Sequence, residues 1–138
     1  MASDISERLR AEVTQRADHR CEYCLIREED SAFLHQIDHI ISRKHGGTSA
    51  ADNLALACVL CNRHKGSDVS SVDGATGAVT RIFNPRRDTW YEHFQILNER
   101  IEPLTAVGRV TVHLLRVNAP ERLAERRLLQ QLGVYPLG

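Results

Sequence analysis

Two Cys-x-x-Cys pairs place the strongest constraint on how this chain folds. The pairs are Cys21-Glu-Tyr-Cys24 and Cys58-Val-Leu-Cys61, and they account for all four cysteines of the sequence. Each such turn sets two sulfurs on one side of a metal ion, so two turns complete a tetrahedral zinc shell. A closed four-sulfur shell has no position for water or substrate. We therefore predict a structural Zn²⁺ whose binding contributes to folding and joins two distant segments.

Two other interpretations of the cysteines have less support. Buried cysteines can act as small apolar residues, but two pairs of identical spacing disfavour this. A redox dithiol needs one pair beside a βαβ unit, which the sequence does not suggest. The polar N-terminal segment lacks the apolar core of a signal peptide, so we expect a cytoplasmic protein with reduced thiols. Its apolar stretches fall short of the roughly 20 residues that cross a bilayer, and no membrane span is predicted.

Short elements of secondary structure are predicted between and after the cysteine pairs. The β-branched run 35–41 predicts a strand, and a polar loop containing Gly46-Gly47 separates it from a second strand at 54–57. A short helix is expected to follow Cys58 and to end near Gly66. The order is therefore strand, strand, helix.

The remaining segments predict a helix at the start of the chain and two at its end. Asp4 and Glu7 form a capping-box pattern ahead of apolar residues at four-residue spacing, namely Ile5, Leu9, Val13 and Ala17. Thr105 is predicted to cap a helix with one apolar face, formed by Val107, Val110, Leu114 and Val117. Pro120 starts a further helix, for which we predict the packed face Leu123, Arg127, Leu128 and Leu132.

The segment between the short helix that ends near Gly66 and the last two helices contains weaker signals. Residues 69–83 contain two glycine turns between β-branched residues, which favours a hairpin or an extended loop. Asp88 is expected to cap a turn. We assign the aromatic patch that follows, Trp90, Tyr91 and Phe94, to the core.

Length and charge limit the organisation of the molecule. A chain of 138 residues suits one compact domain, which we predict to span 1–138 with a core at about 19–68 and an extension at about 69–138. The formal net charge is zero, so any surface that binds a polyanion must be local.

Between the cysteine pairs lies an ordered set of polar residues. Asp38-His39 lies in the first predicted strand, Asn53 precedes the second, and Asn62 directly follows Cys61. This order resembles the HNH endonuclease motif. The resemblance extends to the C-terminal part of small stand-alone bacterial HNH proteins through three further segments, Phe83–Arg86, Trp90–Phe94 and Gly108–Val112.

The resemblance implies an α+β fold with a ββα-metal core braced by zinc, flanked by an N-terminal helix and a C-terminal helical extension. It also implies metal-dependent hydrolysis of nucleic-acid phosphodiesters. A histidine can take a proton from water near neutral pH, so His39 is the expected general base. Asp38 and Asn62 offer the oxygen ligands that suit Mg²⁺ or Mn²⁺. By the same resemblance, Asn53 lies behind His39 and holds it in position.

Other residues near the motif are weaker candidates. His64 is an alternative metal ligand, although its helical offset from Asn62 turns it in another direction. Four basic residues are expected to form a rim that contacts backbone phosphates, namely Arg43, Lys44, Arg63 and Lys65. DNA is favoured over RNA as the partner. A single active site favours nicking unless the protein forms a homodimer.

Two alternatives to a stand-alone nuclease remain open. A non-catalytic zinc ribbon that binds nucleic acid or protein would need the cysteines but would leave Asp38, His39 and Asn62 without a role. A toxin-type nuclease would share the chemistry, but such proteins normally carry delivery domains. The order of the polar residues favours the catalytic interpretation.

Overall fold

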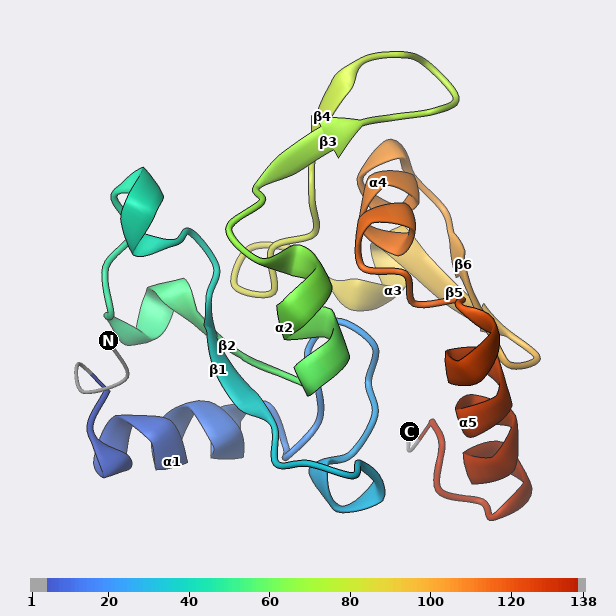
Figure 1. Ribbon diagram of the computed structural model, residues 1–138, viewed down its shortest axis with the longest axis horizontal. Coiled ribbons are helices and arrows are strands. Elements are labelled where there is room, and N and C mark those ends of the chain that lie inside the picture. Colours follow the sequence, from blue (N-terminus) through green and yellow to red (C-terminus); the bar gives the residue numbers. More distant parts are fainter. Residues whose placement is uncertain (1–4, 137–138) are drawn as a thin grey trace.

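The structure, a computed structural model, describes residues 5–136. Figure 1 shows α1 and the strands β1 and β2 on one side of the molecule, α2 in the middle, and α4 and α5 on the other side. The α+β class predicted from the sequence is confirmed: helices alternate with three separate two-stranded antiparallel sheets within the described residues.

The first half of the chain contains the strand, strand, helix unit that the sequence predicted. β1 (Gln36–His39) pairs with β2 (Leu54–Ala57), and α2 (Val59–Lys65) follows at once and ends at Gly66. Two short 3-10 turns, Arg43–His45 and Ala51–Asn53, shape the loop between the strands. All four residues of β2 are buried, which places this strand at the centre of the unit.

Helix α1 (Glu7–Arg16) covers the outer face of β2. Its Val13 is fully buried against Leu54 and Leu56, as the apolar spacing predicted. The side chain of Ser6 accepts a hydrogen bond from the Leu9 amide and so caps the helix. The predicted capping residue Asp4 lies outside the described residues.

The second half adds two hairpins and three helices. The predicted hairpin is present as β3 and β4, and a second hairpin, β5 and β6, was not predicted. The elements of this half are β3 (Ser70–Val72), β4 (Val79–Arg81), α3 (Trp90–His93), β5 (Phe94–Leu97), β6 (Arg100–Pro103), α4 (Ala106–Leu114) and α5 (Pro120–Gln131). In the missed turn, Asn98 adopts a positive φ of 55°, which asparagine tolerates better than most residues. The side chain of Thr105 caps α4, as predicted.

Three details of the predicted packing are wrong. Helix α5 buries Arg122, Arg126 and Leu129, whereas the predicted Leu128 and Leu132 are exposed. The reason is that both arginines find backbone carbonyl acceptors inside the protein, which periodicity alone does not reveal. Tyr91 is exposed, although Trp90 and Phe94 are buried as expected.

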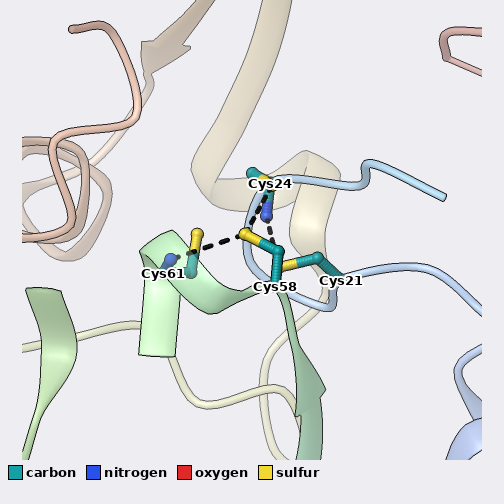
Figure 2. A group of neighbouring side chains, drawn as sticks. All are labelled: Cys21, Cys24, Cys58 and Cys61. Atoms are coloured by element: carbon teal, nitrogen blue, oxygen red, sulfur yellow. Dashed lines mark hydrogen bonds between the residues drawn. The ribbon is translucent and has the colours of Figure 1, made fainter. Parts of the chain in front are cut away.

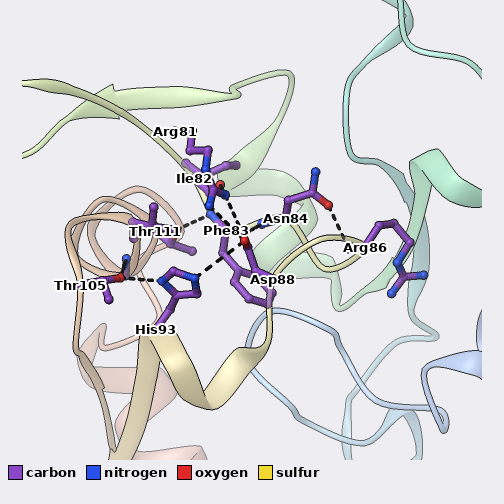
Figure 3. Close-up of polar contacts among 11 residues, drawn as sticks. Arg81, Ile82, Phe83, Asn84, Arg86, Asp88, His93, Thr105 and Thr111 are labelled. Atoms are coloured by element: carbon purple, nitrogen blue, oxygen red, sulfur yellow. Dashed lines mark hydrogen bonds and ion pairs between the residues drawn. The ribbon is translucent and has the colours of Figure 1, made fainter.

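Asp88 does not cap α3; this is the third difference. Its carboxylate accepts two hydrogen bonds from Arg81, at 2.6 and 3.0 Å, and one from the Asn84 amide. Figure 3 shows this contact at the base of the β3–β4 hairpin. Charge-assisted hydrogen bonds from an arginine stabilise a carboxylate more than hydrogen bonds from backbone amides at a helix end would. Asp88 therefore pairs with Arg81 and closes the loop that follows β4.

Candidate metal centre and active site

The four cysteines come together from two segments that are far apart in the sequence, a loop that carries Cys21 and Cys24 and the start of α2 (Figure 2). All four are buried, and their sulfur atoms lie within 4.8 Å of one another. The Cys24 and Cys58 sulfurs are 3.7 Å apart. A tetrahedron with Zn–S bonds of about 2.3 Å has edges of about 3.8 Å, so the donor set fits zinc. The predicted grouping of these cysteines is confirmed.

Backbone amides prepare each pair for a thiolate. The Cys24 amide donates to the Cys21 sulfur and the Cys61 amide donates to the Cys58 sulfur, both at 3.4 Å. Cys58 is also the N-cap of α2. These hydrogen bonds offset negative charge on the sulfurs, and they fix α2 relative to the cluster.

Asp38 and His39 end β1 and point to opposite sides, as alternation in a strand requires. Asp38 faces inward, where its side chain is only 3% exposed. Its carboxylate accepts from the Tyr23 hydroxyl at 2.7 Å and from Lys65 Nζ at 3.2 Å. Burial raises the pKa of Asp38 above its ordinary value, and the Lys65 ammonium offsets part of that effect.

His39 lies on the other side of β1 and is partly exposed. Its Nε2 atom is 3.0 Å from the hydroxyl of Ser49. Ser49 lies in the loop between β1 and β2 and was not predicted from the sequence to belong to the site. Tyr23 was missed as well, although its place inside the first cysteine pair brings it close to the metal site. Only the folded chain brings these two hydroxyl groups to the Asp38-His39 dipeptide.

Lys65 differs most from its predicted position. The sequence placed it on an exposed helix face as a phosphate contact, but its side chain is 1% exposed. Its ammonium donates to Asp38 and to the His39 carbonyl oxygen at 3.0 Å. It is therefore an internal partner of the dipeptide, because a buried carboxylate next to the last turn of α2 attracts the cation inward.

Asn62 lies beside Asp38, and together they could hold a second, catalytic ion. The Asn62 Nδ2 atom is 3.4 Å from Asp38 Oδ1. Neighbouring ligands of an octahedral ion with bonds of about 2.1 Å are about 3 Å apart, so this spacing fits Mg²⁺ or Mn²⁺ once the amide presents its oxygen. An ion held by these two residues would have its remaining coordination positions open to water or substrate.

Asn53 closes the loop behind His39. Its side-chain oxygen accepts from the Ile41 amide at 3.0 Å, and its Nδ2 donates to the carbonyl oxygens of Ile41, at 2.9 Å, and Thr48, at 2.7 Å. Gly47 permits this closure, since a Cβ atom there would lie 1.7 Å from the Ile41 carbonyl oxygen. Through these contacts Asn53 holds together the two ends of the loop that follows His39, which is compatible with the predicted role of positioning His39.

The other candidate residues lie on α2 and in the loop between β1 and β2. His64 points toward the C-terminal half, and burial, followed by the charges of Arg122 and Arg116, lowers its pKa. Arg63 lines a small cavity of about 210 Å³ that also borders Cys24. Arg43 and Lys44 are exposed in the loop between β1 and β2.

The segment 81–88 ties the C-terminal half to this site. Arg86 donates to the Leu54 carbonyl oxygen at 3.2 Å and forms an ion pair with Glu22. The Phe83 amide donates to the Thr111 hydroxyl of α4 at 2.8 Å. Figure 3 shows Phe83, Arg86 and Thr111 at the 81–88 loop. The loop therefore contacts β2 on one side and α4 on the other.

Comparison with known proteins shows one family similarity, in the N-terminal half of the chain. Residues 21–68 match the family model described as HNH endonuclease. The chain is also similar to the Septu protein PtuB of Bacillus thuringiensis, with 25% identity over 115 residues that cover 82% of this chain and 42% of that protein. The chain thus spans less than half the length of that relative. No solved structure matches the chain.

Proposed function

We propose, from the premise that residues 21–68 form an HNH endonuclease domain, that this protein is a metal-dependent endonuclease acting on nucleic acid, with DNA favoured over RNA. The observation that carries the proposal is that Asn62 of α2 lies beside Asp38, with His39 next to Asp38 at the end of β1, near a cysteine cluster that fits structural zinc. A zinc ribbon that only binds has no need of this polar set.

None of the helices in residues 5–136 is long and apolar enough to cross a membrane.

Each residue has a defined task in the proposed hydrolysis. His39 accepts the proton of the attacking water, and its ring must exchange the Ser49 hydroxyl for that water. Asp38 and Asn62 would hold a divalent ion, which supplies Lewis-acid stabilisation of the phosphate and the leaving oxygen. The Lys65 ammonium favours the ionised form of the buried Asp38 carboxyl, and Asn53 fixes the loop that carries Ser49.

A second aspect of the proposal is how the substrate is held. Arg43 and Lys44 are exposed in the loop that follows His39, and Arg63 is exposed on α2. Contacts from such residues to backbone phosphates bind nucleic acid without reading bases. With one active site in each chain, nicking is the expected outcome, and a homodimer would be needed to cut both strands.

Cleavage of supercoiled plasmid by zinc-loaded protein tests the proposal. Added Mg²⁺ or Mn²⁺ should produce nicked circles, and His39→Ala should reduce the rate by roughly 10²- to 10⁴-fold. His45→Ala is the matched control, because His45 is an exposed histidine of the same loop and has no assigned role. Equal rates for His39→Ala and the parent would refute the assignment of the base. Binding without cutting by every variant would favour the zinc-ribbon alternative.

A further inference from the structure

A buried arginine from the far end of the chain contacts the cysteine cluster. Arg122 lies in the first turn of α5 and is 4% exposed. Its Nη2 atom is 3.1 Å from the Cys61 sulfur and 3.7 Å from the Cys58 sulfur. Its Nη1 atom donates to the Leu115 carbonyl oxygen at 2.8 Å, which fixes the direction of the guanidinium. The donor thus reaches the metal site from outside the segment that matches the HNH family.

The charge of the cluster explains why a guanidinium belongs there. Four thiolates around one Zn²⁺ carry a net charge of −2, and a buried charge is costly unless it is paired and hydrogen-bonded. The amides of Cys24 and Cys61 offset part of that charge. Arginine remains protonated even when buried, and its planar group can direct a donor at sulfur.

A neighbouring arginine shows that burial alone does not create this contact. Arg126 lies one turn further along α5 and is 3% exposed. Its donors bond to the Glu99 and Val117 carbonyl oxygens and to the Asn118 side chain. Arg126 therefore satisfies backbone acceptors, whereas Arg122 adds the bonds to sulfur.

From this geometry we propose that Arg122 is a charge-compensating residue of the metal centre, and that α5 thereby determines how tightly the ion is held. The cysteine pairs supply the ligands, and the C-terminal helix supplies the balancing charge. In return, the loaded site holds the start of α5 against α2. This inference concerns the cysteine site and is independent of the proposed nuclease activity.

Cobalt substitution of the full chain provides the test. Co²⁺ bound by thiolates has sulfur-to-metal charge-transfer bands, and loss of an N–H donor to the sulfurs should move these bands to lower energy. Arg122→Met should shift the bands and weaken Zn²⁺ binding by roughly 10- to 100-fold in chelator competition, the range typical of partners that contact metal ligands. Arg122→Lys keeps the charge and should recover part of the affinity.

Arg126→Met is the matched control. It removes an arginine of equal burial from the same helix, so a loss of stability caused by missing carbonyl bonds should appear in both variants. A shift of the charge-transfer bands should appear only for Arg122 variants. Unshifted bands with unchanged Zn²⁺ affinity in Arg122→Met would overturn the proposal. If that variant does not fold, Arg122→Lys decides, because its altered donor geometry must move the bands.

Discussion

Replacing Lys65 by methionine tests the buried ion pair at the end of β1. The two charged side chains are 1% and 3% exposed, and Lys65 Nζ lies 3.2 Å from Asp38 Oδ1. Methionine preserves much of the side-chain volume but removes the ammonium. The Asp38 carboxylate would then keep the Tyr23 hydroxyl and the Asn62 amide as partners but would lose its counter-charge.

The magnitude follows from the cost of leaving one charge buried. Breaking a buried ion pair from one side costs about 3–5 kcal/mol, which is a large part of the 5–15 kcal/mol that stabilises a typical domain. Burial already raises the pKa of Asp38, and loss of the ammonium raises it further. A raised pKa in the folded state penalises the ionised form of Asp38. The loss of stability in Lys65→Met is therefore full above the pKa of Asp38 in the folded variant, and it shrinks as the pH falls below that pKa. The Asp38→Asn/Lys65→Met double variant should be more stable than Lys65→Met, because it buries no charge.

Urea unfolding at saturating zinc, followed by circular dichroism, measures these differences. Lys44→Met removes an exposed lysine and should change stability by less than about 0.5 kcal/mol. The salt dependence of nucleic-acid binding adds a second readout, because loss of a phosphate contact lowers the slope by about 1. A deficit of less than about 1 kcal/mol for Lys65→Met, combined with a lower slope, would refute the buried position and restore the surface contact predicted from the sequence.

Three further perturbations follow from the structure. Gly47→Ala should lower stability and nuclease activity more than Gly46→Ala does, because a Cβ at Gly47 would collide with the Ile41 carbonyl. Gly46 has open space around it, so alanine there meets only the strain of a positive φ, about 1–2 kcal/mol. Equal urea midpoints for the two variants would contradict this. Asp73→Asn removes a carboxylate whose pKa Arg109 holds well below its usual range, so stability is contributed above the unfolded pKa near 3.9 and lost as pH falls. The deficit should be full at pH 7, begin to shrink only as the pH falls below about 4, and keep shrinking toward the much lower folded pKa, and a pH-independent deficit would exclude linkage. Chelation of zinc should unfold the chain reversibly, because binding contributes roughly 10–16 kcal/mol; unchanged far-UV circular dichroism after metal removal would argue against a folding role.

Much of the fold could be predicted because its signals are local. The cysteine spacing predicted the metal cluster, and the apolar spacing predicted that α1 packs through Val13. Thr105 and Gly66 marked helix ends that the structure confirms. The β5–β6 hairpin was missed because a single asparagine at its turn is a weak signal beside the aromatic patch before it.

The candidate site was predictable in composition but not in arrangement. The order of Asp38, His39, Asn53 and Asn62 is a sequence property, and it sufficed to name the residues that the fold brings near one another. Their roles remain predictions that the cleavage assay addresses. The partners Tyr23 and Ser49 carry no motif, so only their contacts identify them.

The sequence by itself determined the cysteine set of the metal site, the order of elements and the location of the polar set, because thiolate chemistry, residue spacing and helix caps act over a few positions. Tertiary structure alone decided which charges are buried. Lys65, Arg122 and Arg126 would be assigned to the surface by any pattern that counts them as polar. Each of the three side chains is buried because it donates hydrogen bonds to acceptors from distant segments. These acceptors are carboxylate, carbonyl and sulfur groups, which would otherwise lack these donors inside the fold.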